Sequence, residues 1–237
     1  MELKEVIAKL EALANPEKVA FKQKKFAVVA DNSLGIYQAD LKALAKEIGR
    51  NSDLGIQLFE TGIYEARLLC SKIFQTKDLT NDLIEAWVKT FENWEICDSF
   101  CMGLFAKSDF AVPKINEWQD RTREFERRAS FATLAGYCMA DKKASNEVYE
   151  AFLPLIKGAA TDERIYVKKA VNWALRSIGK RNKDLNQQAI ATAREILEYD
   201  SKAAKWIAKD ALRELEKPTA NILDYPRAIY RPKAPKK

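Results

Sequence analysis

The amino-acid sequence predicts an all-α protein in which paired helices repeat along the chain as a solenoid. Apolar residues recur at helical spacing through the body of the 237-residue chain, the pattern of helices that bury one face. No segment shows a convincing alternation of apolar and polar residues, as half-buried strands do. A period of about 40 residues adds the third indication, because stacked helix pairs repeat at that length.

The expected helices follow one another with short connections. Their approximate ranges are 2–14, 16–28, 38–50, 53–59, 63–75, 80–91, 94–106, 112–119, 122–139, 145–157, 162–180, 184–198 and 201–216. Glycines lie at or near several of the ends, where helices commonly stop. The last stretch, 218–237, holds four of the seven prolines, and proline removes a helical hydrogen bond. We expect an extended or loosely packed basic tail there, which serves either solubility or DNA contact.

The repeat is visible in three helices that share a small residue. Successive spacings of 41 residues separate Ala129, Ala170 and Ala211. Paired helices at this period are typical of HEAT-like or armadillo-like solenoids, which present one helix of each pair on an inner wall. We therefore expect a single repeat domain over 1–217 with a concave basic cleft. Trp173 takes the position that Ala132 and Glu214 hold in the other repeats, so it departs from the stacking pattern.

A basic stripe with a tryptophan in it marks the segment around residue 173. On a helix, one side carries Lys169, Trp173, Arg176 and Lys180, and the apolar residues gather opposite. From Arg164 to Lys183 the chain carries seven basic residues and no acidic one. Cations around a flat aromatic ring suit a nucleic acid, which offers phosphates and ring-shaped units. The structural alternative is a tryptophan packed at an edge under the tail.

Composition narrows the chemistry. The chain has no histidine, and its four cysteines form no CxxC pair, so we expect buried free thiols, no metal site and no cofactor. Without histidine, any acid–base chemistry must use carboxylates. No apolar run approaches a membrane span, and the charged amphipathic N-terminus is unlike a signal peptide. We expect a cytoplasmic, monomeric protein without membrane contact. The net charge of +6 falls mostly on the tail and the basic segment.

A second group of interest lies in the segment FENWEICDSFCMGLFAKS. Trp94 and Asp98 are four residues apart and share a helical face, whereas the apolar residues between them form the opposite face. Asp98 has no basic residue three or four positions away on its own helix. Two interpretations stay open: a functional pair, or a tryptophan that caps the core and a carboxylate that meets an arginine from a neighbouring helix.

Three segments together, WEICD, FERRASFA and TDERIYVKKAVNWALRSIGKRN, resemble the AlkD-type DNA alkylation repair glycosylases over most of the chain, to about Glu216. The resemblance implies a HEAT-like fold and excision of cationic N3-methyladenine and N7-methylguanine from duplex DNA without base flipping. It implies catalytic roles for Asp98, Trp94 and Trp173. We assign DNA binding to the cations of these segments: Arg128, Lys168, Lys169, Arg176, Lys180 and Arg181.

The residue types suit this chemistry. An alkylated purine already carries a positive charge, so it leaves without a general acid, and an ionised Asp98 would stabilise the sugar cation and position water. Because no lysine stands out as a Schiff-base nucleophile, we expect monofunctional hydrolysis. Asn93 stands before Trp94 where the best-studied members carry a second tryptophan. Two alternatives are a DNA-structure-binding protein of the same fold that excises no base, and a HEAT-type protein–protein scaffold with Trp173 as a hot spot.

Overall fold

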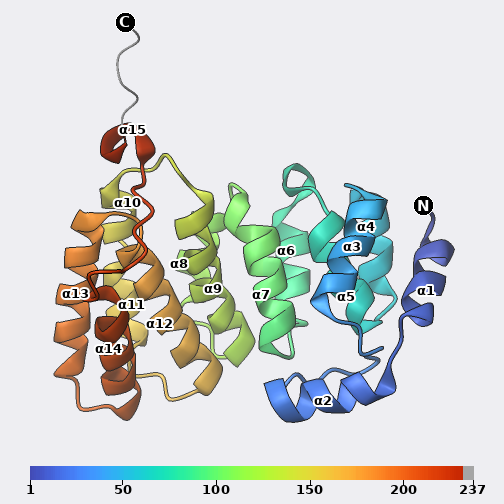
Figure 1. Cartoon of the computed structure of the whole chain (residues 1–237), viewed down its shortest axis with the longest axis horizontal. Coiled ribbons are helices and arrows are strands. Elements are labelled where there is room, and N and C mark those ends of the chain that lie inside the picture. Colours follow the sequence, from blue (N-terminus) through green and yellow to red (C-terminus); the bar gives the residue numbers. More distant parts are fainter. Residues whose placement is uncertain (232–237) are drawn as a thin grey trace, which may run out of the picture. The chain divides into compact units, whose positions relative to one another are not determined.

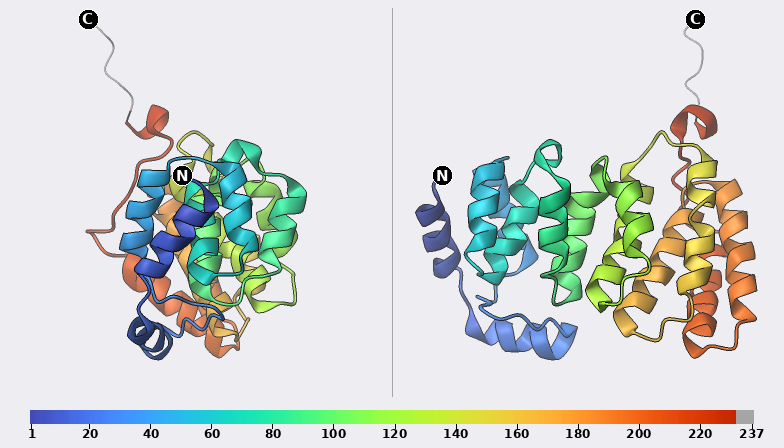
Figure 2. Two further views of the ribbon diagram at one scale, coloured as in Figure 1. Left: turned by 90° about the vertical axis from the view of Figure 1, so that its right-hand side faces the viewer. Right: turned by 180° about the vertical axis from the view of Figure 1, so that it is seen from behind.

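The computed structural model describes residues 1–231, and within this range the regular structure is helical throughout, as the sequence predicts (Figures 1 and 2). The chain divides into two compact units, Met1–Phe110 and Ala111–Lys237. We call them the N-terminal and the C-terminal unit and describe each by itself. None of the described helices is long and apolar enough to cross a membrane.

The N-terminal unit packs its helices in two layers. Its elements are α1 (Leu3–Ala12), α2 (Pro16–Phe26), α3 (Gln38–Ile48), α4 (Ser52–Glu60), α5 (Tyr64–Ile73), η1 (Thr76–Asp78), α6 (Asn81–Val88), α7 (Trp94–Gly103) and η2 (Phe105–Lys107). One layer consists of α3, α5 and α7, which lie side by side, and α4 packs on α5. The two helices α5 and α7 approach closely at Gly103, where an added Cβ atom would lie 2.9 Å from the backbone oxygen of Ser71. Glycine at this position therefore permits the packing.

The C-terminal unit repeats the pairing. Its elements are α8 (Ala111–Trp118), α9 (Glu124–Ala140), α10 (Asn146–Glu150), α11 (Leu153–Ala159), α12 (Ile165–Gly179), α13 (Lys183–Leu197), α14 (Lys202–Leu215) and α15 (Arg227–Tyr230). The layer of α9, α12 and α14 is backed by α8, α11 and α13 respectively. The three repeat alanines, Ala129, Ala170 and Ala211, lie on the layer helices and are fully buried. Helix α12 packs against both α9 and α14, and this stacking of equivalent helices confirms the helical repeat.

One expected helix is two helices. The sequence pattern predicts a continuous helix over 145–157, but α10 ends at Glu150 and α11 begins at Leu153. Pro154 lies in the first turn of α11, where the missing N–H costs nothing. A continuous helix would place the proline in the interior, where its ring clashes with the preceding turn. The break therefore follows from Pro154.

The tail is better ordered than its proline content predicts. Leu223 N–H donates to the Lys180 carbonyl oxygen at 2.8 Å, and Tyr225 N–H donates to that of Arg181 at 2.7 Å. Beyond them α15 forms one helical turn, and its Tyr230 hydroxyl donates to Asp184 at 2.6 Å. The expectation of a loosely packed, helix-free arm is thus wrong up to residue 231. The rest of that tail, 232–237, lies outside the described residues.

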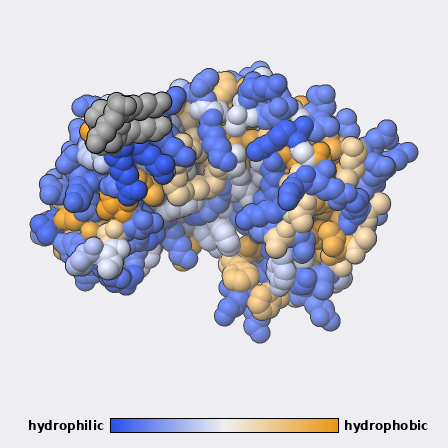
Figure 3. Space-filling view, turned by 45° about the horizontal axis from the view of Figure 1, so that its top comes forward, coloured by the Kyte–Doolittle hydropathy of each residue, from blue (hydrophilic) through white to orange (hydrophobic). Residues whose placement is uncertain are grey.

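The cysteine side chains and the possible metal ligands can now be located in the structure. All four cysteines are buried and free, which confirms that expectation. In residues 1–231 no group of three or more potential ligand side chains could hold a metal ion. Hydrophobic side chains on the face shown in Figure 3 are interspersed among hydrophilic ones.

Candidate nucleic-acid interface

The start of α7 is fixed by the side chain of Asn93, which precedes Trp94. Asn93 is the N-cap residue, and its Oδ1 accepts from the backbone N–H groups of Glu95 and Ile96 at 2.9 and 3.2 Å. Its Nδ2 donates to the Val29 carbonyl oxygen at 3.0 Å. A tryptophan could not cap the helix in this way. Asparagine at this position therefore has a structural reason: it orients the helix that carries Trp94.

A buried polar cluster fixes the first turn of α7. The Glu95 carboxylate lies 2.9 Å from the Lys22 ammonium and accepts hydrogen bonds from Tyr64 Oη at 2.9 Å and Gln38 Nε2 at 3.0 Å. Burial, reinforced by the negative charge of Glu95, raises the pKa of Tyr64, so its hydroxyl stays protonated and donates. Nothing local in the sequence pairs Lys22 with Glu95, because the partners belong to helices far apart along the chain.

Trp94 and Asp98 lie one turn apart on α7, and both side chains are half-buried. Ile96, Cys97 and Phe100 on the opposite side are fully buried, as the helical spacing predicts. The Trp94 indole N–H donates to the Phe26 carbonyl oxygen at 2.9 Å, so the end of α2 fixes the ring. The structure thus presents an aromatic ring and a carboxylate together, each with part of its surface open.

Helix α12 separates the apolar and basic residues as expected. Val167, Val171 and Ala174 are fully buried, whereas Lys169 is exposed and Trp173 is half-buried. No hydrogen bond to the Trp173 indole is found in residues 1–231. The tail makes its backbone hydrogen bonds at the far end of α12, two turns beyond the ring. Lys169 and Trp173 therefore offer a cation and an aromatic face on one side of the helix.

The other two members of the stripe are not free cations. Glu214 of α14 accepts from Arg176, and the Lys180 ammonium donates to it at 2.7 Å. Burial alone would raise the pKa of Glu214, but the hydrogen bonds from Lys180 and Arg176 outweigh it and lower that pKa. The carboxylate is therefore charged and partly neutralises the stripe. An acid on a separate helix was invisible to a reading of the α12 sequence alone.

Lys168 of α12 forms a cation–π pair with Trp206. This tryptophan was not singled out from the sequence. The Lys168 ammonium lies 5.4 Å from the centroid of the Trp206 ring on α14, and this ring is 39 % exposed. Such a cation–π pair holds the lysine near a second open aromatic surface. An exposed tryptophan among lysines in the segment KAAKWIAKD was the signal that could have found it.

Arg128 of α9 is buried, with 5 % of its surface exposed, and its Nη1 donates to the Tyr166 carbonyl oxygen at 2.6 Å. This bond ties α9 to the start of α12, the helix that carries Trp173. Arg127 beside it pairs with Asp162 at 2.9 Å. Arg128 therefore positions the start of α12 through its hydrogen bond to Tyr166.

Arg181, which was assigned to DNA binding from the sequence, is fully buried and offers no exposed surface to a phosphate. The guanidinium lies 3.6 Å from the centroid of the Tyr149 ring, and Nη1 donates to the carbonyl oxygens of Cys138 and Asp141 at 2.5 and 2.8 Å. Its Nη2 lies 3.4 Å from the Asp141 carboxylate. Arg181 therefore belongs to the core between helices, and this burial counts against the DNA-binding role predicted for it.

Comparison with known proteins places the chain in a family. The sequence profile described as DNA alkylation repair enzyme matches residues 6–215, so the chain belongs to this family. No curated protein matches the sequence significantly.

Among solved structures, one protein covers 94 % of this chain and 97 % of its own, with a TM-score of 0.75 and 19 % identity. It is described as belonging to a new family related to the HEAT-like repeat DNA glycosylases, with affinity for branched DNA structures. At this identity the match shows the fold: this chain has the HEAT-like repeat fold of those proteins. A designed armadillo repeat protein matches at a TM-score of 0.34, with 16 % identity over 75 % of this chain and 92 % of its own, too low to bear on the fold.

Proposed function

We propose that the protein releases cationic alkylpurines from duplex DNA by hydrolysis of the N-glycosidic bond. The observation that carries the proposal is the Trp94–Asp98 pair on α7, one turn apart and partly open, in a chain of the DNA alkylation repair family. A carboxylate beside an aromatic face suits a sugar that gains positive charge as the base departs. Asp98 would stabilise that charge, and Trp94 would pack against the sugar and exclude water.

Under this proposal the C-terminal unit holds the DNA backbone. Lys169 supplies an exposed cation, and Trp173 lies one turn away from it on α12. Such contacts fix register without reading sequence. The resemblance to the AlkD-type glycosylases further implies that the alkylated base stays in the duplex. The experiment that tests the function is release of N7-methylguanine from duplex DNA by the wild-type protein under single-turnover conditions. No release of any cationic alkylpurine would reject it.

A second candidate is DNA binding without base release. Affinity for branched DNA in the structurally similar protein favours it, and so does Asn93, which occupies a family tryptophan position as a helix cap. The same assay separates the candidates, since a binding-only protein retains branched and duplex DNA but releases no base. The protein–protein scaffold predicts affinity for neither DNA in any salt.

Two substitutions at the α12 stripe are expected to change DNA affinity in opposite directions. We expect Lys169→Gln to weaken duplex binding and to reduce the slope of log affinity against log salt by about one, because one phosphate contact is lost. We expect Glu214→Gln to strengthen binding, because Lys180 loses its carboxylate partner and Arg176 keeps only Asp210, 3.9 Å away. Fluorescence anisotropy over a range of salt concentrations measures both changes.

Lys202→Gln is the matched control for this pair, since Lys202 is an exposed lysine of the same unit outside α12. The result that contradicts the assignment is a Glu214→Gln protein that binds no more tightly than wild type, together with Lys169→Gln equal to the control. In that case the α12 stripe does not contact the DNA.

A further inference from the structure

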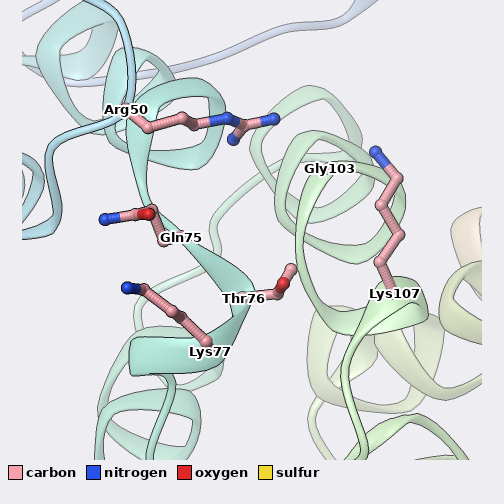
Figure 4. A pocket seen from close by; sticks show the side chains of 6 residues that line it. All are labelled: Arg50, Gln75, Thr76, Lys77, Gly103 and Lys107. Carbon is pink, nitrogen blue, oxygen red and sulfur yellow. The ribbon is translucent and has the colours of Figure 1, made fainter.

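Two neighbouring hollows of the N-terminal unit, with volumes of about 350 and 440 Å³, share Arg50, Gly103 and Lys107 among their lining residues. They open on the layer formed by α3, α5 and α7, and Figure 4 shows the smaller one. Five cations line them: Lys42, Arg50, Lys72, Lys77 and Lys107. Neither hollow is lined by an aspartate or a glutamate. The layer that carries Trp94 and Asp98 thus also carries a concentrated positive charge.

In the part of the chain that the structure describes, these cations lack the salt-bridge partner that some other basic residues of the unit have. Lys9 pairs with Glu47, and Arg67 pairs with Glu92, at 2.6 and 2.8 Å. Within residues 1–231, none of the five lining cations forms a salt bridge. Asp78 follows Lys77 in the chain, but its carboxylate accepts from Ser52 at 2.5 Å and Gln75 at 3.3 Å. Among the described residues, no carboxylate therefore lies within salt-bridge distance of the lining cations.

Arg50 is held in place by the end of α5. Its Nη1 donates to the carbonyl oxygens of Lys72 and Phe74 at 2.9 and 3.0 Å, and no described residue accepts from its Nη2. In Figure 4 its guanidinium and the Lys107 ammonium extend toward the same space. A cation that satisfies the last carbonyls of a helix is ordinary, which explains Arg50. It does not explain Lys107, which belongs to η2, or Lys42 on α3.

The pKa of Lys72 is lowered by its burial and by a neighbouring lysine. Burial, together with the nearby charge of Lys42 from α3, lowers the pKa of Lys72 to about 8, against the opposing effect of Glu95 from α7. Its ammonium is therefore poorly stabilised in the protein alone. A group held at such a cost is typical of a site that is completed by a ligand of opposite charge.

We propose that these hollows bind backbone phosphates of the nucleic acid, as an anchoring point of the N-terminal unit beside the Trp94–Asp98 pair. The inference rests on the proposed function, since the partner is the same DNA. Ser99, which follows Asp98, lines the larger hollow, and so does Gly103. Gly103 lies about 7.5 Å beyond Asp98 along the axis of α7, which is about two base-pair steps of roughly 3.4 Å along the duplex axis. Cations spread over three elements suit an extended polyanion better than a single small anion.

A charge-matched pair of double variants tests the proposal. The pocket variant combines Lys42→Gln with Lys107→Gln, and the control combines Lys46→Gln with Lys89→Gln, two exposed lysines of the same unit outside the hollows. Both lose two charges, so a general effect of net charge cancels. We expect the pocket variant to bind duplex DNA about tenfold more weakly at 0.1 M salt and to reduce the salt slope by about two. The control should stay within about twofold of wild type.

Three readouts separate the outcomes. Base release at subsaturating protein should fall together with DNA affinity in the pocket variant and stay close to the wild-type rate in the control. If wild type releases no base but the pocket variant still loses DNA affinity, the proposed function fails and the phosphate site stands. If the pocket variant and the control bind DNA equally, the hollows do not hold DNA and the inference is overturned. The inference is also overturned if the pocket variant loses the wild-type affinity for tripolyphosphate but keeps the wild-type affinity for DNA.

The pH dependence provides a second arm. A bound phosphate favours charged Lys72, whereas free protein loses this proton as pH rises through about 8. Affinity for DNA should therefore fall between pH 7 and pH 9, with uptake of up to about one proton on binding. Lys72→Met should remove this fall and, because it eliminates a poorly solvated charge, should raise the melting temperature while weakening binding at pH 7. An unchanged pH profile in this variant counts against phosphate contact at Lys72.

Discussion

Replacing Asp98 by asparagine is expected to slow release of N7-methylguanine by about a hundredfold to a thousandfold, the usual cost of losing one electrostatic contact to a transition state. The carboxylate attracts the sugar only as positive charge develops there, so the change affects the chemical step. In the ground state the same carboxylate repels the phosphate backbone. DNA binding should therefore be unchanged or slightly tighter.

Single-turnover release and equilibrium binding are measured in parallel for this prediction. Asp109→Asn is the matched control, because Asp109 is an exposed carboxylate of the same unit away from α7. Trp94→Ala should cost less than Asp98→Asn, since a ring positions the sugar and excludes water but supplies no full charge. Equal rates for wild type and Asp98→Asn would remove Asp98 from the mechanism.

Arg181→Met is expected to destabilise the protein by about 3–5 kcal/mol, the usual cost of removing one partner of a buried charged pair. The change leaves the Cys138 and Asp141 carbonyl oxygens without their donor. Burial alone would raise the pKa of Asp141, but hydrogen bonds from Tyr149 and nearby backbone N–H groups, together with the charge of Arg181, lower it. Without Arg181 the carboxylate keeps its charge with less support.

Urea unfolding at pH 7 measures this loss, and DNA affinity is measured on the fraction that remains folded. Lys183→Met is the control, because Lys183 is exposed and only two residues away. We expect DNA affinity per folded molecule to be close to that of wild type. A stable Arg181→Met protein with weakened DNA binding would show instead that the residue reaches the ligand, as its place in a basic sequence run first indicated.

The candidate site was partly readable from the sequence. Helical spacing places Trp94 and Asp98 on one open face and Ile96 on the buried one, and the structure agrees. On α12 the structure also agrees with the helical spacing, because Lys169 is exposed and Trp173 is half-buried. These results depend only on the rotation of about 100° per residue. The polar cluster around Glu95 was not readable, because its partners come from other helices.

The sequence by itself determined the all-helical repeat, the buried faces of α7 and α12 and the membership of the basic stripe. Local spacing suffices for these, since one helix turn sets which residues share a face. Only the tertiary structure decided that Arg181 is buried, that Glu214 pairs with Arg176, and that Lys42 and Lys107 line adjoining hollows. Charge balance and burial depend on which helices become neighbours, and residues tens of positions apart acquire that relation only when the repeats stack.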